Sequence, residues 1–333
     1  MPSPTPETRN PHVEDGAEPA VEPRIMRALI GSFGVMAIFT RIGLGSALPA
    51  TVFGMLFALC TGAFAGQYVR VSPDLEIYYE EAGTGTPMVF IPGWTLTTEV
   101  FSKQRTYFAS RYRAITYDPR GQGRSSKTLD NNHYTQHGAD LKALMDILHL
   151  KDVVVIAHSY GCFDAYAYFR AFGSDNVKAF VCIDESPKPI VQQQGDWGFL
   201  TTFDDLRAFS NDIIHSRREA MPGVVRSMVG RKLADGEIDW LVEEMMKTPN
   251  FVALPLGFSG DLADYTEDAK TLDAKIPILY VLRQADGWTT AGSSWLKKHM
   301  PNSRAIAFGS HLMFWELPDR FNSALDAFLE KLR

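Results

Sequence analysis

A serine lies between two small residues at the end of an apolar run. Residues 153–161 read VVVIAHSYG, so Ser159 has Ala157 two positions before it and Gly161 two positions after it. A serine on a sharp turn from strand to helix needs small residues at both positions, because the strained backbone there is closely packed. The apolar run before Ser159 and the helical pattern that follows it, as far as Phe172, favour such a turn. We therefore expect Ser159 to be a nucleophile.

A serine hydroxyl is a weak nucleophile at neutral pH and needs a base, which in turn needs a carboxylate to orient it. His311 is the only histidine after the last predicted strand, at 304–308. Asp286 follows the predicted strand at 278–282 after a three-residue loop. Ser159, Asp286 and His311 thus follow one another along the chain in an order known for catalytic triads of a serine, an acid and a histidine. His311 is the expected base and Asp286 the expected acid.

Other residues compete for these roles. Asp184 and Glu185 directly follow the predicted strand at 177–183, and either is an alternative acid. His158 precedes the nucleophile, but its side chain must point away from that of Ser159, which favours a structural role.

A metal site is the alternative for a group of residues before the serine motif. His133, His137 and Asp140 have a spacing that would place them on one face of a helix. The start of a solvated helix explains them better. We expect no metal and no organic cofactor.

The elements that must position these residues alternate along the chain. Apolar and alternating runs predict a hairpin followed by strands that are separated by helical segments such as 139–150. This order predicts an α/β fold with a mostly parallel sheet and helices on both faces. The predicted strands are 67–72, 75–80, 88–91, 112–117, 153–157, 177–183, 278–282 and 304–308.

The alternation is interrupted at about 188–265 by a long, mainly helical stretch. A structureless loop of this length would be improbable in a compact domain, so we expect an inserted helical cap. Its aromatic and methionine residues are expected mainly to pack the cap itself. They are Trp197, Phe199, Phe203, Phe209, Trp240, Met245, Met246, Phe251 and Phe258.

From about residue 75 to 333 the chain resembles the α/β-hydrolase superfamily, in its cap-bearing branch of esterases, lactonases, C–C hydrolases and cofactor-free haloperoxidases. The matching motifs are Pro92-Gly93-Trp94, the segment DPRGQGRS at 118–125, the turn at Ser159, Asp286, and His311 followed by WELP at 315–318. Many members have histidine where this chain has Pro92.

The resemblance implies a fold, a site and a reaction. It implies backbone N–H donors at Trp94 and Tyr160 for a developing oxyanion. It also implies that Asp118 and Arg120 stabilise a turn near the site. We expect a small-molecule ester or lactone to be cleaved through an acyl-enzyme. A perhydrolase, haloperoxidase or C–C hydrolase with the same triad is the alternative, and a non-catalytic ligand-binding protein is the alternative of another class.

The N-terminal part differs in composition from the rest. Residues 1–25 are polar and proline-rich, which predicts a disordered tail. Residues 26–66 are mainly apolar, with charges only at Arg27 and Arg41, and the sequence Ala63-Phe64-Ala65 precedes Gly66. This pattern predicts a cleaved signal or a membrane anchor, and hence an exported or membrane-associated enzyme. A buried helical hairpin is the alternative, and the catalytic domain is expected at 67–333.

Overall composition excludes one class of function. The net charge is −6 and the basic residues are scattered, so nucleic-acid binding is not expected. The three cysteines are Cys60, Cys162 and Cys182. They imply no disulfide framework, and the last two are expected to be small buried hydrophobic residues.

Overall fold

The computed structural model describes residues 66–332. The predictions of a disordered tail and of an apolar signal or anchor fall, except for Gly66, outside the described residues. Within 66–332, no helix is both long and apolar enough to cross a membrane.

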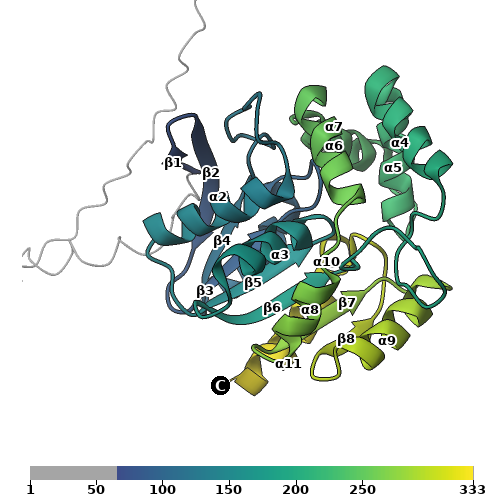
Figure 1. Ribbon diagram of the computed structural model, residues 1–333. Helices are drawn as coiled ribbons and strands as arrows, with labels where there is room; N and C mark the ends of the chain where they lie inside the picture. The colour runs from purple at the N-terminus through teal and green to yellow at the C-terminus, as the bar shows by residue number, and fades with distance from the viewer. Residues whose placement is uncertain (1–65, 333) are drawn as a thin grey trace, which may run out of the picture. The chain divides into compact units, whose positions relative to one another are not determined.

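A twisted eight-stranded sheet forms the centre of the described chain (Figure 1). Its strand order is β1-β2-β4-β3-β5-β6-β7-β8, with antiparallel pairing only among β1, β2 and β4. The strands are β1 (Gln67–Ser72), β2 (Leu75–Ala82), β3 (Pro87–Ile91), β4 (Arg113–Tyr117), β5 (Val153–His158), β6 (Val177–Ile183), β7 (Ile278–Leu282) and β8 (Arg304–Ala307).

The central strand β5 is buried on both faces, which is why its sequence is a continuous apolar run. Val153, Val155 and Ala157 pack into one half of the core, and the residues between them, Val154 and Ile156, pack into the other. This alternation follows from the two-residue repeat of a strand. The loop after β5 is therefore anchored from both sides of the sheet.

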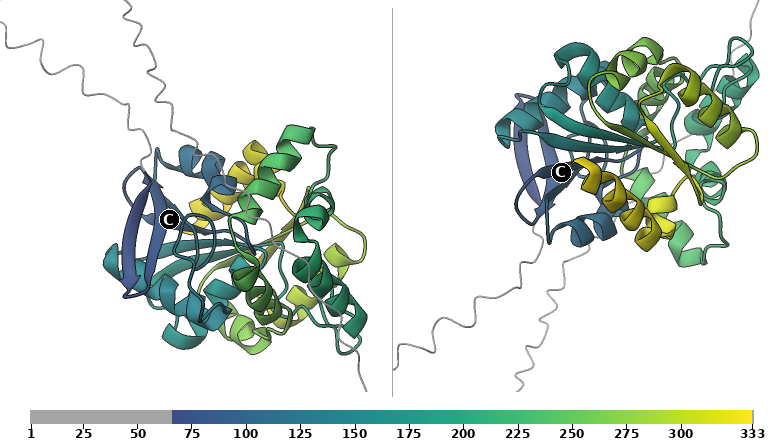
Figure 2. Two further views of the ribbon diagram at one scale, coloured as in Figure 1. Left: turned by 90° about the horizontal axis from the view of Figure 1, so that it is seen from above. Right: turned by 90° about the horizontal axis from the view of Figure 1, so that it is seen from below.

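Helices cover both faces of the sheet, as the two views of Figure 2 show. Apolar side chains of α2 (Tyr134–Ile147), α3 (Gly161–Phe172), α8 (Thr266–Asp273) and α9 (Trp288–His299) share one half of the core. Those of α1 (Ser102–Phe108), α10 (Met313–Glu316) and α11 (Pro318–Leu329) share the other. The predicted fold class is confirmed.

Four further helices are inserted between β6 and β7, on the upper right in Figure 1. They are α4 (Phe203–His215), α5 (Arg217–Met228), α6 (Asp235–Met246) and α7 (Asn250–Asp261). Met221 and Val225 of α5 pack with Leu241 and Met245 of α6, so part of the cap has its own apolar contacts. Trp197 instead lies against Trp288 of α9, at a ring-centroid distance of 5.2 Å.

Helix α2 begins at Tyr134, earlier than the predicted start at residue 139. The Nδ1 atom of His133 accepts a hydrogen bond from the backbone N–H of Gln136 and so caps the helix. Histidine is not among the usual capping residues, so the sequence pattern did not indicate this start.

The contact between α2 and α3 sets the position of the helix that follows Ser159, and it leads to a stability prediction. A Cβ atom on Gly138 of α2 would lie 2.5 Å from the backbone nitrogen of Tyr168 in α3. We expect Gly138→Ala to lower the free energy of unfolding by about 1–3 kcal/mol, because the helices must separate. In the matched control Gly236→Ala, the new Cβ meets nothing within 4 Å. The control should keep or raise stability, by up to about 1 kcal/mol. Urea denaturation measures both, and equal losses would contradict this view of the helix contact.

Candidate active site

Ser159 lies on the turn between β5 and α3 with a φ of 51°, in the left-handed region that non-glycine residues rarely adopt. Close packing around the turn explains its small neighbours. A Cβ atom on Gly161 would lie 2.5 Å from the carbonyl oxygen of Pro92. A Cβ atom on Gly93 would lie 3.0 Å from the Cβ atom of Ser159. The structure therefore has the sharp turn that the sequence predicts.

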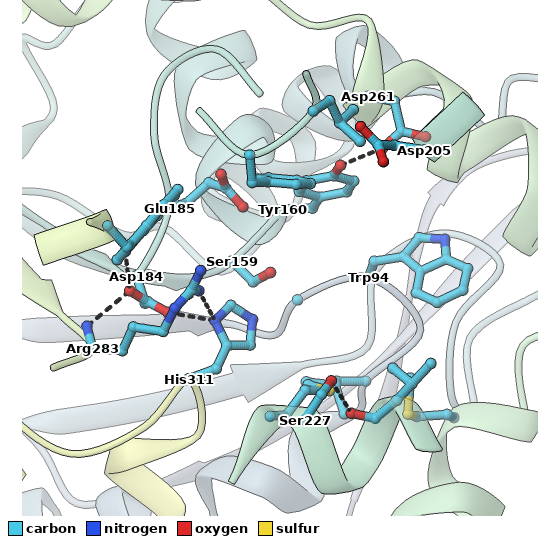
Figure 3. Close-up of a pocket in the computed structure, with 18 residues that line it drawn as sticks. Trp94, Ser159, Tyr160, Asp184, Glu185, Asp205, Ser227, Asp261, Arg283 and His311 are labelled. Carbon is cyan, nitrogen blue, oxygen red and sulfur yellow. Dashed lines mark hydrogen bonds and ion pairs between the residues drawn. The ribbon is translucent and has the colours of Figure 1, made fainter. Parts of the chain in front are cut away.

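His311 follows β8 and lies next to Ser159 at the wall of one cleft (Figure 3). Its Nδ1 atom is 2.6 Å from Oδ2 of Asp184, at a carboxyl that is fully buried. Figure 3 shows the opposite edge of the imidazole turned toward the Ser159 hydroxyl. The ring thus lies between a carboxylate and a hydroxyl.

Asp184 is held by four donors. Its Oδ1 atom accepts hydrogen bonds from the backbone N–H of Arg283 and from Nε1 of Trp288, both at 2.8 Å. Its Oδ2 atom accepts from Nη1 of Arg283 at 2.7 Å as well as from His311. Although burial opposes ionisation, the hydrogen bond from His311 and the adjacent charges lower the pKa of Asp184 to about 2. The carboxylate is therefore ionised at neutral pH.

The structure does not bring Asp286 to His311. Asp286 is exposed in the loop between β7 and α9, and among the described residues its carboxylate has no hydrogen bond or ion pair. The residue that follows β7 directly, Arg283, occupies the space beside His311, whereas Asp184 follows β6 directly. The prediction of Asp286 as the acid partner of His311 is corrected to Asp184, which was the alternative together with Glu185.

His158 supports His311 from behind. The Nε2 atom of His158 donates to the backbone carbonyl of His311 at 3.0 Å, and the two rings are 4.5 Å apart. Complete burial lowers the pKa of His158 well below its usual value, so its ring is neutral. This is the structural role that we expected for His158.

The loop after β3 carries Trp94 and is held by the segment after β4. The Gln122 side chain accepts a hydrogen bond from the backbone N–H of Thr95, which has a φ of 61°. Oδ1 of Asp118 accepts from the backbone N–H of Thr98 at 2.7 Å. Trp94 lines the same cleft as Ser159, and so does Tyr160, which precedes the first turn of α3. Backbone N–H groups at a helix start lack partners within the helix.

The side chains of Trp94 and Tyr160 both reach helix α7 of the cap. Nε1 of Trp94 donates to the backbone carbonyl of Ala253 at 2.8 Å, and the Tyr160 hydroxyl donates to Oδ1 of Asp261. Two residues beside Ser159 are thus hydrogen-bonded to the cap.

The cleft has a volume of about 590 Å³ and is lined by both the sheet end and the cap. Sequence reasoning did not place Arg283 or Asp261 in this site, because neither belongs to a local motif. Glu185 and Asp261 also line the cleft, and these residues are only 2% and 3% exposed. Burial raises the pKa of Glu185 to about 8 and that of Asp261 to about 6.

The residues considered for a metal site have other partners. His133 caps α2, His137 is 3.2 Å from a carboxyl oxygen of Asp164, and Asp140 forms an ion pair with Arg120. Within residues 66–332, no group of three or more His, Cys, Asp and Glu side chains is arranged to hold a metal ion.

Comparisons with known proteins agree with the fold. Residues 86–215 match the family described as the alpha/beta hydrolase fold. A putative non-heme chloroperoxidase of Synechocystis is 27% identical over 285 residues, which are 78% of this chain and 96% of the relative. The crystal structure of a bromoperoxidase from Bacillus anthracis is similar with a TM-score of 0.73 at 23% identity, over 80% of this chain and all of that one. An esterase from Exiguobacterium antarcticum also has a TM-score of 0.73, at 20% identity and the same coverage. Together with the sheet order and the inserted cap, these similarities show that the chain has the α/β-hydrolase fold.

Proposed function

We propose that this protein is a serine hydrolase that cleaves a carboxylic ester or lactone. The observation that carries the proposal is the position of His311, whose ring lies between the Asp184 carboxylate and the Ser159 hydroxyl in the cleft. A hydroxyl, an imidazole and a buried carboxylate in this order form a system that activates the hydroxyl for attack on a carbonyl.

The proposed reaction has two halves. The Ser159 oxygen attacks the ester carbonyl while His311 takes the hydroxyl proton at Nε2 and passes it to the departing alcohol. A water molecule then gives its proton to His311 and attacks the acyl-enzyme, which releases the acid and restores Ser159. Asp184 stabilises the imidazolium that forms in each half and keeps the Nδ1 proton in place.

The negative charge that develops on the carbonyl oxygen needs donors. We assign these to the backbone N–H groups of Trp94 and Tyr160, which come from the two loops on either side of Ser159. Fixed donors of this kind contribute about 3–4 kcal/mol each to stabilisation of the transition state. The proposed chemistry requires no cofactor.

The substrate should be compact. A cleft of about 590 Å³ suits a small organic molecule better than a long lipid chain. Leu96, Val224, Met228 and Met245 give it apolar wall area. Trp315 stacks on Trp240 of the cap and does not line the cleft.

Perhydrolysis is a second candidate, favoured by the similarity to a putative non-heme chloroperoxidase and to a bromoperoxidase. Hydrogen peroxide would replace water in the second half of the reaction, so that the acyl-enzyme releases a peracid. Assays with acetate and hydrogen peroxide, followed by peracid detection, distinguish this activity from hydrolysis alone.

The nucleophile assignment predicts the result of one substitution. Ser159→Ala should abolish labelling by a fluorophosphonate probe and lower kcat by several powers of ten, because the members of a triad act as a unit. Probe labelling and hydrolysis of p-nitrophenyl acetate are the measurements, with the urea unfolding curve as a check on folding. Labelling that persists in the folded variant would contradict the assignment.

A second prediction separates the two aspartates. A proton held between His311 and a carboxylate gives a resonance far downfield of the amides in the ¹H NMR spectrum. Asp184→Asn should remove this resonance and lower kcat by about 10⁴-fold, because the imidazole loses its orienting charge. Asp286→Asn should keep the resonance and change kcat less than about twofold, as is usual for an exposed side chain away from a site. The reverse result would restore Asp286 as the acid.

A third prediction concerns acyl length. Each methylene that fits the cleft adds about 1–3 kcal/mol to transition-state binding until the wall is reached. The value of kcat/KM for p-nitrophenyl esters should therefore rise with acyl length and then fall. A series from acetate to palmitate tests this, and a maximum at the longest chains would indicate an open, lipase-like site.

A further inference from the structure

Acidic residues outnumber basic residues among those that line the cleft. Four carboxyl groups line it, whereas among its described lining residues Arg283 supplies the one Lys or Arg charge. That guanidinium is already paired with Asp184 at 2.7 Å. Three carboxyls, those of Glu185, Asp205 and Asp261, are left without a cationic partner in the cleft.

Two of these carboxyls belong to buried residues, and each has one oxygen that accepts no hydrogen bond from the described residues. Oε1 of Glu185 accepts from the backbone N–H and the hydroxyl of Ser186, and Oδ1 of Asp261 accepts from Tyr160. Within the described residues, Oε2 of Glu185 and Oδ2 of Asp261 accept no hydrogen bond. Figure 3 shows the Tyr160 ring between the two carboxyls, facing the open part of the cleft. Each of these two oxygens is therefore available to a ligand bound in the cleft.

Aromatic faces line the same wall. The ring of Phe199 stacks on that of Tyr160 with a centroid distance of 6.3 Å, and both rings line the cleft. The faces of aromatic rings attract cations, most strongly where water is excluded. Spare carboxyl oxygens and aromatic faces together are the two kinds of group that bind organic cations.

We propose that Glu185, Asp261 and the Tyr160–Phe199 pair form a subsite for an organic cation, so that the preferred ester or lactone carries an amine or quaternary ammonium group. This inference rests on the proposed hydrolase function and names its substrate class. Burial raises the pKa of both carboxyls, at Glu185 even though the charge of Arg283 opposes it, and a bound cation would favour the ionised form of each.

Two pairs of esters that differ only in charge test the proposal, with the cation on either side of the carbonyl. One pair is p-nitrophenyl 4-(trimethylammonio)butanoate and p-nitrophenyl 5,5-dimethylhexanoate. The other is the acetate esters of choline and of 3,3-dimethylbutanol. In at least one pair, kcat/KM for the cationic ester should exceed that for its neutral partner by about tenfold or more. A ratio of one or less in both pairs overturns the proposal.

Substitutions that keep the shape of a side chain but remove its acidic group then locate the subsite. Glu185→Gln and Asp261→Asn should each lower the cationic-to-neutral ratio by about tenfold, because each removes a carboxyl group that a bound cation would hold in its ionised form. The matched control is Asp212→Asn, an exposed cap residue that does not line the cleft, and it should leave the ratio unchanged. Fluorophosphonate labelling checks that each variant retains its site. An unchanged ratio in both cleft variants overturns the assignment.

A binding measurement separates failure of this inference from failure of the proposed function. If the wild-type protein hydrolyses neither ester of either pair, the proposed function fails. Calorimetry with butyltrimethylammonium and the Ser159→Ala protein then decides the subsite alone. Binding that Glu185→Gln weakens supports the subsite, and absence of binding at millimolar ligand overturns it.

Discussion

The Asp184 carboxylate joins more parts of the site than any other group described in it. It follows β6, accepts from the backbone and side chain of Arg283 after β7, from Trp288 at the start of α9, and from His311 after β8. Three segments that are distant in sequence, at 184, 283–288 and 311, thus meet at two oxygen atoms. A buried charge is stable only when it is paired and hydrogen-bonded, so the loops must keep this arrangement for the carboxylate to stay ionised.

The position of Ser159, the proposed nucleophile, depends on a different constraint, which is steric. Ser159 has a positive φ, and the backbone of the neighbouring loop passes so close that a Cβ atom at position 161 would lie 2.5 Å from the carbonyl oxygen of Pro92. The continuous apolar strand β5 anchors this turn from both faces of the sheet. The strained backbone conformation of Ser159 persists because the packing around the turn leaves it no other conformation.

Sequence reasoning succeeded where a local pattern has one structural meaning. The apolar run at 153–158 and the small residues around Ser159 indicated strand and turn, and the position of His311 after the last strand placed it beside Ser159. It failed for the carboxylate, because aspartates follow both β6 and β7. Only the path of each loop decides which of them turns inward. Arg283 fills the place after β7 and carries Asp286 past the site into solvent.

The residues that line the cleft opposite Ser159 were not predictable for a related reason. Asp261 is the last residue of α7 and lies beside Tyr160 only because the cap folds back over the end of the sheet. Contacts between an insertion and its host domain leave no periodic signal in either segment. Glu185 was considered for the triad and instead faces the cleft beside it.

Through the hydrogen bonds of Trp94 and Tyr160 to α7, the cap helps to hold the segments on both sides of Ser159. Trp94 and Tyr160 are also the residues whose backbone N–H groups we assign to the oxyanion. The same helix therefore bounds the substrate through Asp261 and fixes, through two side chains, the segments that carry the charge-stabilising amides. This limits which sequences α7 can have. If α7 lost the acceptor at the Ala253 carbonyl or the one at Asp261, the positions of the proposed oxyanion donors would change together with the shape of the cleft.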